Sequence, residues 1–184
     1  MQKQINVPEF LQEFHGKRTS LFSIILVYLS ALIVSAIISL QFLPKGFPAW
    51  KTTIFVIVVM DIAGGVIANF TNATKIYYQD KPIKRILFLS LHIIHPLLFM
   101  ILFPKEIALF TLMGVYTLLS SFILNVLSPG ETQRLLAVFF VTVGITIVFV
   151  LPSEFVFLKL LPILFFLKLI LGFSVKKHSD IENN

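Results

Sequence analysis

Residues 52–73 read TTIFVIVVMDIAGGVIANFTNA, an apolar stretch in which Asp61 is the only charged residue. About 20 apolar residues in a helix are enough to cross the hydrocarbon layer of a bilayer. A charged side chain is costly at that depth, so a charge kept inside such a stretch is a functional candidate whose partner must be identified. The stretch therefore predicts a transmembrane helix and, at Asp61, a position of chemical interest.

The composition of the whole chain agrees with a membrane protein. Of its 184 residues, 57% are hydrophobic and 13% are charged. A soluble domain of this size has too little interior to bury so much apolar surface. The chain has no cysteine, which excludes disulfides, thiolate metal sites and cysteine nucleophiles. Its net charge of +6 comes from basic residues at the ends of apolar runs, which indicates membrane orientation and not nucleic-acid binding.

Six apolar runs are long enough to span a bilayer, and they cover residues 20–43, 52–73, 86–103, 107–127, 135–151 and 155–174. We predict an all-α, polytopic integral membrane protein with six transmembrane helices in contact with the lipid bilayer. Residues 1–19 form a cytoplasmic or interfacial amphipathic segment, residues 20–174 a single bundle, and residues 175–184 a cytoplasmic tail. Three connections begin with an apolar residue followed by proline, which favours a helix end: Leu43–Pro44, Phe103–Pro104 and Leu151–Pro152.

The distribution of Lys and Arg predicts the orientation. With the N-terminus inside, ten basic residues lie on the cytoplasmic side: Lys3, Lys17, Arg18, Lys75, Lys81, Lys84, Arg85, Arg134, Lys176 and Lys177. Four lie on the other side: Lys45, Lys51, Lys105 and Lys159. The positive-inside rule then places both termini in the cytoplasm of a multi-pass protein of the cell membrane. Lys168 falls within the last run, and we expect its side chain to snorkel to the inner interface.

The segment before the first run has the pattern of a short amphipathic helix. Asn6 is placed to cap it, Pro8 suits its first turn, and Glu9 completes a capping box. Apolar side chains then follow on one face: Val7, Phe10, Leu11 and Phe14. We expect this helix to lie on the inner membrane surface.

A pair of histidines in the third run is expected to meet Asp61. Counting inward at a helical rise puts Asp61 about 15 Å deep, and His92 and His95 about 10 and 15 Å from the inner side, so all three lie near the midplane. The two runs are joined by a short connection and are expected to be neighbours. Pro96 cannot donate to the carbonyl of His92, which leaves a free acceptor at the same depth.

The second run also has a small and polar face at helical spacing, formed by Asp61, Gly64, Gly65, Ala68, Asn69 and Asn72. Glycines on such a face allow another backbone to approach closely. We expect Asn69 and Asn72 to line an inward route to Asp61.

Three kinds of chemistry fit the predicted site. Asp61, His92 and His95 could relay protons, could bind a small polar solute, or could hold a divalent ion such as Zn²⁺. We favour binding or movement of a small polar solute or protons, with an intramembrane, metal-dependent hydrolase as the alternative. A purely structural Asp61–His92 packing pair is the second alternative. No cofactor is predicted, and the absence of a Walker loop, nucleophile elbow or His-Glu-x-x-His pattern favours a non-enzyme.

The chain resembles two known families in general outline. The six short spans with a small-residue ridge at Ala31, Ser35 and Ser39 are similar to the substrate-binding subunits of energy-coupling vitamin transporters, whose motifs the chain does not match residue by residue. That ridge predicts packing inside the bundle or against a partner subunit. The Asp61, His92 and His95 set resembles that of intramembrane metal hydrolases of the ceramidase type, but the full ligand set of that family is missing. Such likeness of outline does not fix function.

Overall fold

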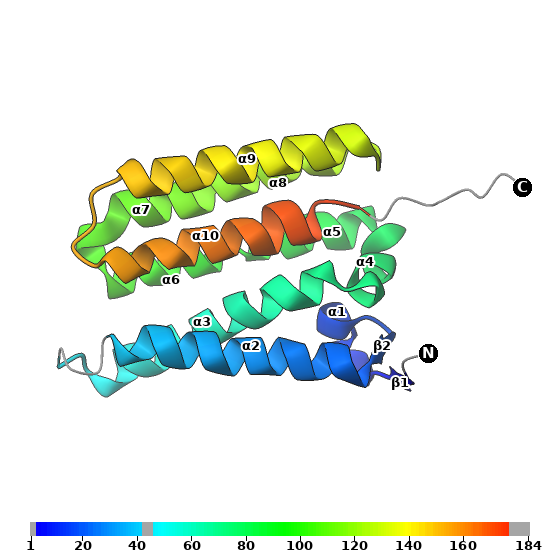
Figure 1. Cartoon of the computed structure of the whole chain (residues 1–184), viewed down its shortest axis with the longest axis horizontal. Coiled ribbons are helices and arrows are strands. Elements are labelled where there is room, and N and C mark those ends of the chain that lie inside the picture. Colours follow the sequence, from blue (N-terminus) through cyan, green and yellow to red (C-terminus); the bar gives the residue numbers. More distant parts are fainter. Residues whose placement is uncertain (1–2, 42–45, 177–184) are drawn as a thin grey trace, which may run out of the picture.

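Six long apolar helices run side by side in the computed structural model, which describes residues 3–41 and 46–176 (Figure 1). Their bounds are Leu21–Leu40, Ala49–Phe70, Pro82–Leu102, Pro104–Val126, Glu131–Val150 and Val156–Phe173. Each is long and apolar enough to cross a membrane, so the predicted all-α, six-span architecture is confirmed. The Leu43–Pro44 helix end and residues 177–184 of the predicted tail lie outside the described residues.

Some spans are single helices and others are divided. The undivided ones are α2 (Leu21–Leu40), α3 (Ala49–Phe70) and α9 (Glu131–Val150). The third span consists of α5 (Pro82–Leu91) and α6 (Ile94–Leu102). The fourth consists of η3 (Pro104–Glu106), α7 (Ile107–Thr111), the π-helical η4 (Leu112–Tyr116) and α8 (Thr117–Val126). The sixth consists of η5 (Val156–Lys159), α10 (Leu160–Phe166) and the π-helical η6 (Leu167–Phe173).

Local chemistry explains where the helices begin and end. Pro82 occupies the first turn of α5, so this helix begins four residues before the expected start of the third span. As predicted, α6 and α9 end just before Phe103–Pro104 and Leu151–Pro152. Thr71 ends α3 with an extended backbone, and its hydroxyl accepts a hydrogen bond from the Thr74 amide at the start of α4 (Asn72–Gln79).

The last span forms the centre of the bundle. Its side chains at Leu161, Phe165, Phe166, Leu169 and Ile170 are completely buried. In Figure 1 the orange α10 lies between α9 and α3. Burial on all sides is expected of a helix that is surrounded by other helices.

Helix α2 lies at the edge of the bundle and packs mainly on α3 (Figure 1). Its small-residue ridge at Ala31, Ser35 and Ser39 is buried there. A Cβ added at Gly64 of α3 would lie 3.4 Å from the Ala31 Cβ, which shows how closely the two helices approach. The ridge therefore packs on α3 inside the chain, which is the first of the two predicted roles.

The N-terminal segment differs from the single helix that was predicted. Strands β1 (Gln4–Asn6) and β2 (Arg18–Ser20) pair antiparallel, and η1 (Glu9–Leu11) and α1 (Gln12–His15) lie between them. Asn6 is not a helix cap, because it lies in β1, where its Oδ1 accepts a hydrogen bond from Arg18 Nε at 3.2 Å. The backbone amide and carbonyl groups of β1 and β2 therefore bond between the two strands and not within the predicted helix.

The two ends of the bundle carry different elements. We call the end that carries β1, α4 and the end of η6 the terminal end (Figure 1). The predicted assignment of this end to the cytoplasm stays a prediction.

Candidate functional site

Asp61 lies halfway along α3. It is about 18 Å from the start of the helix at Ala49, which is near the middle of a hydrocarbon layer about 30 Å thick. Its side chain is 41% exposed, which is unusual for a carboxylate at this depth. The predicted need for a partner therefore applies to this residue in the folded structure.

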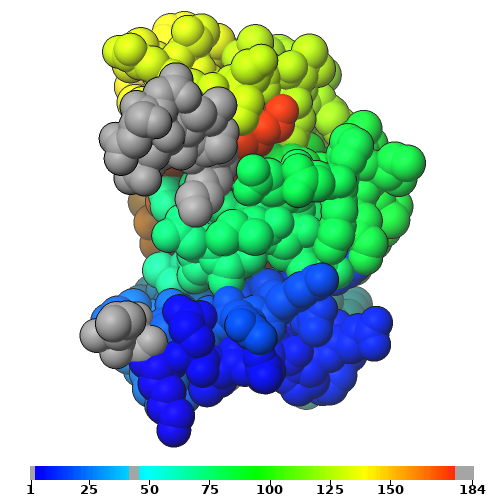
Figure 2. Space-filling model, turned by 90° about the vertical axis from the view of Figure 1, so that its right-hand side faces the viewer, coloured from blue at the N-terminus to red at the C-terminus, as the bar shows by residue number. Residues whose placement is uncertain are grey.

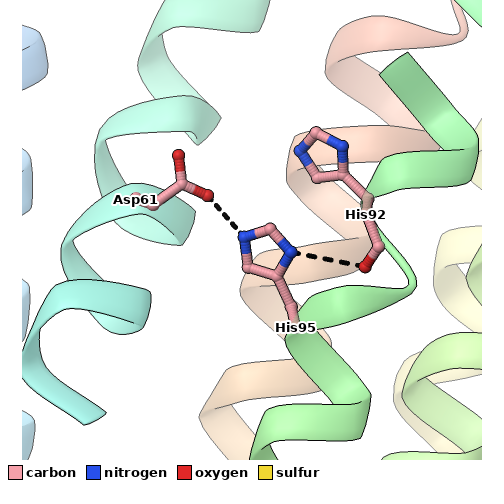
Figure 3. A group of neighbouring side chains, drawn as sticks. All are labelled: Asp61, His92 and His95. Atoms are coloured by element: carbon pink, nitrogen blue, oxygen red, sulfur yellow. Dashed lines mark hydrogen bonds and ion pairs between the residues drawn. The ribbon is translucent and has the colours of Figure 1, made fainter. Parts of the chain in front are cut away.

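His95 provides one partner. Its Nε2 lies 2.6 Å from Asp61 Oδ2, as Figure 3 shows. Its Nδ1 lies 3.3 Å from the carbonyl oxygen of His92. That carbonyl is the one that Pro96 leaves without its normal helical donor, so the predicted free acceptor is used to hold the neighbouring imidazole.

His92 is buried and stacks on His95, with ring centroids 5.0 Å apart and planes 9° from parallel. Its Nδ1 lies 2.6 Å from the carbonyl oxygen of Phe88, one turn earlier in α5. Within the described residues, the hydrogen-bond partner of Asp61 on the third span is His95. The expected contact between Asp61 and a histidine of the third span is thus made by His95, and the Asp61–His92 pair of the structural alternative does not form among the described residues.

Lys168 is the second partner of Asp61, and the sequence analysis missed it. Its Nζ lies 2.6 Å from Asp61 Oδ2 and 3.2 Å from the Asp61 carbonyl oxygen. Only 1% of the Lys168 side chain is exposed, so the prediction that it snorkels to the interface is wrong. A buried ammonium group is stabilised when it pairs with an anion. Asp61 lies within reach of Lys168, so pairing takes the place of exposure at the interface.

One face of α3 accommodates Lys168. Asp61 binds its ammonium group, and Asn69 Nδ2 donates to the Lys168 carbonyl oxygen at 3.0 Å. Gly65 lies between these two residues, where an added Cβ would come within 2.3 Å of the Lys168 Cε. These three residues recur at intervals of four, which was a signal available in the sequence. Lys168 is the second residue of the π-helical η6, and π-helical turns are frequent at functional sites.

The structure separates the two asparagines that were predicted to line a route to Asp61. Asn69 is buried and binds the backbone of the last span. Asn72 is exposed at the start of α4, beyond the break that ends α3. The cluster that the structure brings together, called the Asp61 centre below, therefore consists of Asp61, His92, His95 and Lys168.

The Asp61 centre has some features of a metal site. One potential ligand atom from each of Asp61, His92 and His95 lies within 4.8 Å of the others. Both imidazoles have Nδ1 close to a backbone carbonyl, an arrangement that often orients metal-binding histidines. However, the Lys168 ammonium is bound to Oδ2 of the carboxylate that would serve as a metal ligand. A cation already held at that oxygen opposes the binding of a second one.

No protein-family model, curated protein or solved structure matches this chain. What bears on function is the chemistry of the Asp61 centre and its place in a six-span helical membrane protein.

Proposed function

We propose that this protein passes protons across the cell membrane through the Asp61 centre. The observation that carries the proposal is the meeting of Lys168 and His95 on one carboxylate oxygen of Asp61 in the middle of a membrane span. Ionisable groups at this depth are rare and are characteristic of ion pathways and proton relays. The wider expectation, that a small polar solute binds at the same centre, stays a prediction.

The contacts of His95 support a proton-carrying role. Both of its ring nitrogens face oxygen acceptors, one on Asp61 and one on His92. A neutral imidazole has a hydrogen on only one ring nitrogen, so both contacts are hydrogen bonds only when the ring is doubly protonated. Gain of one proton would therefore make the longer contact and loss would break it, which is the behaviour that a proton relay needs.

His92 offers a neighbouring acceptor. If its Nδ1 donates to the Phe88 carbonyl, the neutral ring keeps a lone pair on Nε2. The ring is stacked on His95, so a proton released there has a second imidazole beside it. With His95 protonated, two cations share the single carboxylate of Asp61, and release of one proton relieves this excess of positive charge.

The structural alternative is an ion pair that only fastens α3 to the last span. It is tested by a variant that removes both charges, Asp61→Asn with Lys168→Met. Replacement of a buried ion pair by neutral groups of similar size is often close to neutral in stability. The purified variant is therefore expected to fold, and its activity then reports on the charges alone.

The experiment measures proton flux into liposomes that contain the purified protein and a pH-sensitive dye, under an imposed membrane potential. Wild type is expected to conduct protons, whereas the double variant falls to the rate of empty liposomes with a Tm close to that of wild type. The matched control removes an exposed pair at the other end of the bundle, Lys105→Met with Glu154→Gln, whose atoms are 3.0 Å apart. Wild-type flux equal to that of empty liposomes, or full flux in the folded double variant, contradicts the proposal.

A metal-dependent hydrolase is the second candidate, and the orientation of the two imidazoles favours it. It predicts stoichiometric zinc in the purified protein, measured by elemental analysis, and loss of that zinc in His92→Ala. If the Lys168 ammonium instead keeps metal ions out, wild type binds Zn²⁺ weakly and Lys168→Gln binds it more tightly, by about fivefold or more, since the repulsion between unit charges at about 4 Å is roughly 1 kcal/mol even in water.

A further inference from the structure

A cavity of about 450 Å³ lies at the terminal end of the bundle, away from the Asp61 centre. Figure 2 looks onto this end, where the end of the last span, in red, lies between the green region of α4 and α5 and the yellow-green region of α8 and α9. The polar residues that line the cavity are Lys75, Gln79, Asp80, Arg85, Asn125 and Lys176. Three cations thus face one carboxylate.

The two most constrained cations are held by neutral groups. Arg85, only 5% exposed, donates from Nε to Asn125 Oδ1 and from Nη2 to the Phe173 carbonyl oxygen, both at 2.8 Å. Lys176 Nζ donates to the carbonyl oxygens of Asn125 and Leu127 at 2.7 and 2.9 Å. These contacts fix the positions of both charges without neutralising either of them.

Positive charge accumulates in this cavity at a cost. Burial, and then the charge of Arg85, lower the pKa of Lys75 and the pKa of Lys176. In residues 3–41 and 46–176, neither these lysines nor Arg85 form an ion pair with a carboxylate. Buried cations are normally compensated by an anion. Asp80 brings one negative charge to a cavity lined by three cations, so the cavity keeps an excess of positive charge that an anionic ligand would compensate.

We propose that this cavity binds the phosphate group of an anionic ligand. Arginine is well suited to phosphate, because its planar donors match phosphate oxygens, and lysine adds a flexible point charge. Among the described residues, the Nη1 of Arg85 donates to no protein atom, so these donors are available. The predicted orientation puts the cavity at the cytoplasmic leaflet, where anionic lipids collect. The phosphate can belong to such a lipid headgroup or to a soluble compound.

The test separates these two sources. Tm is measured in phosphatidylcholine nanodiscs with and without phosphatidylglycerol, and separately in phosphatidylcholine nanodiscs titrated with inorganic phosphate, with chloride at equal ionic strength as the reference. A rise in Tm with phosphatidylglycerol alone supports a lipid headgroup, and a rise with inorganic phosphate supports a soluble ligand. No rise in either arm, or an equal rise with chloride, overturns the proposal.

The variant Lys75→Gln removes a charge from the cavity without removing the hydrogen bonds that hold Arg85. It is expected to weaken binding about fivefold, from roughly 1 kcal/mol per lysine near an anionic surface. Lys81→Gln is the matched control, because Lys81 lies in the same connection but lines a different cavity. Equal loss of binding in both variants would show general charge attraction and would contradict a site at this cavity.

Discussion

Lys168 and Asp61 contribute unequally to stability, because only the lysine is completely buried. Asp61→Asn leaves an unpaired ammonium group in the bundle and is expected to lower the free energy of unfolding by about 3–5 kcal/mol. Lys168→Met leaves a half-exposed carboxylate and costs less. The double variant recovers most of the loss, since it leaves no unpaired charge.

Thermal unfolding of the purified variants in detergent measures these differences. Asn72→Ala, which changes an exposed residue outside the centre, serves as the control and leaves Tm unchanged. Equal Tm values for Asp61→Asn and Lys168→Met would contradict the proposal that the buried Lys168 ammonium depends on Asp61 for its compensating charge.

The sequence identified Asp61, His92 and His95 as neighbours, because depth along a helix follows from counting residues. It did not identify Lys168 as their partner. Lys168 lies close to the predicted end of an apolar run, where a long side chain can reach the interface. The direction in which a residue points inside a bundle depends on how the whole helix is rotated, and that rotation is decided by packing against the other helices, which counting residues along one run does not give.

Helix α3 and the last span approach each other closely at Gly65, and this approach is testable. Gly65→Ala places a Cβ 2.3 Å from the Lys168 Cε, so the lysine side chain must shift, and we expect this shift to weaken its ion pair with Asp61. Gly64→Ala is the matched control, because its Cβ meets α2 at 3.4 Å, close to ordinary contact. We expect a lower Tm and loss of proton flux in Gly65→Ala only; the same behaviour in both variants would show a general intolerance of α3 to side chains.

Helix α1 carries a pH-sensitive contact. His15 is 3% exposed, and its Nε2 lies 3.3 Å from the Tyr28 hydroxyl. Burial lowers the pKa of His15 from its usual value near 6.5. The unfolded segment therefore takes up a proton first as the pH falls. The stabilisation that comes from burying neutral His15 is complete above the usual histidine pKa and declines below it, by at most about 1.4 kcal/mol per pH unit.

Hydrogen exchange of residues 9–20, compared between about pH 7.5 and about pH 5, measures this effect. Faster exchange at the lower pH is expected in wild type and not in His15→Gln, which cannot titrate. Identical pH dependence in the two proteins would assign the effect to another group.

The ends of the elements were predicted with uneven success, for a physical reason. Proline disfavours helical geometry at the residue before it, so the ends at Phe103 and Leu151 could be predicted. The β1–β2 pair depends on residues that are far apart in the sequence, such as Asn6 and Arg18. Such pairing is decided by contacts that a local capping pattern does not contain.

The bundle as a unit is expected to lie with its terminal end in the cytoplasm. The chain has no cysteine, so single cysteines can be introduced without background. Lys105→Cys, at the opposite end, is expected to react with a membrane-impermeant maleimide in intact cells, whereas Ser128→Cys, at the terminal end, reacts only after permeabilisation. The reversed pattern would invert the orientation and move the cationic cavity to the outer leaflet.

The exposed edge of Asp61 has a consequence for the route by which molecules reach it. Ile57, one helical turn away on the same side of α3, is 61% exposed, and we expect this apolar side chain to face acyl chains. Asp61 lies on the same side, with 41% of its side chain exposed. A compound dissolved among lipid tails can therefore meet this acid sideways, without first passing through an aqueous vestibule.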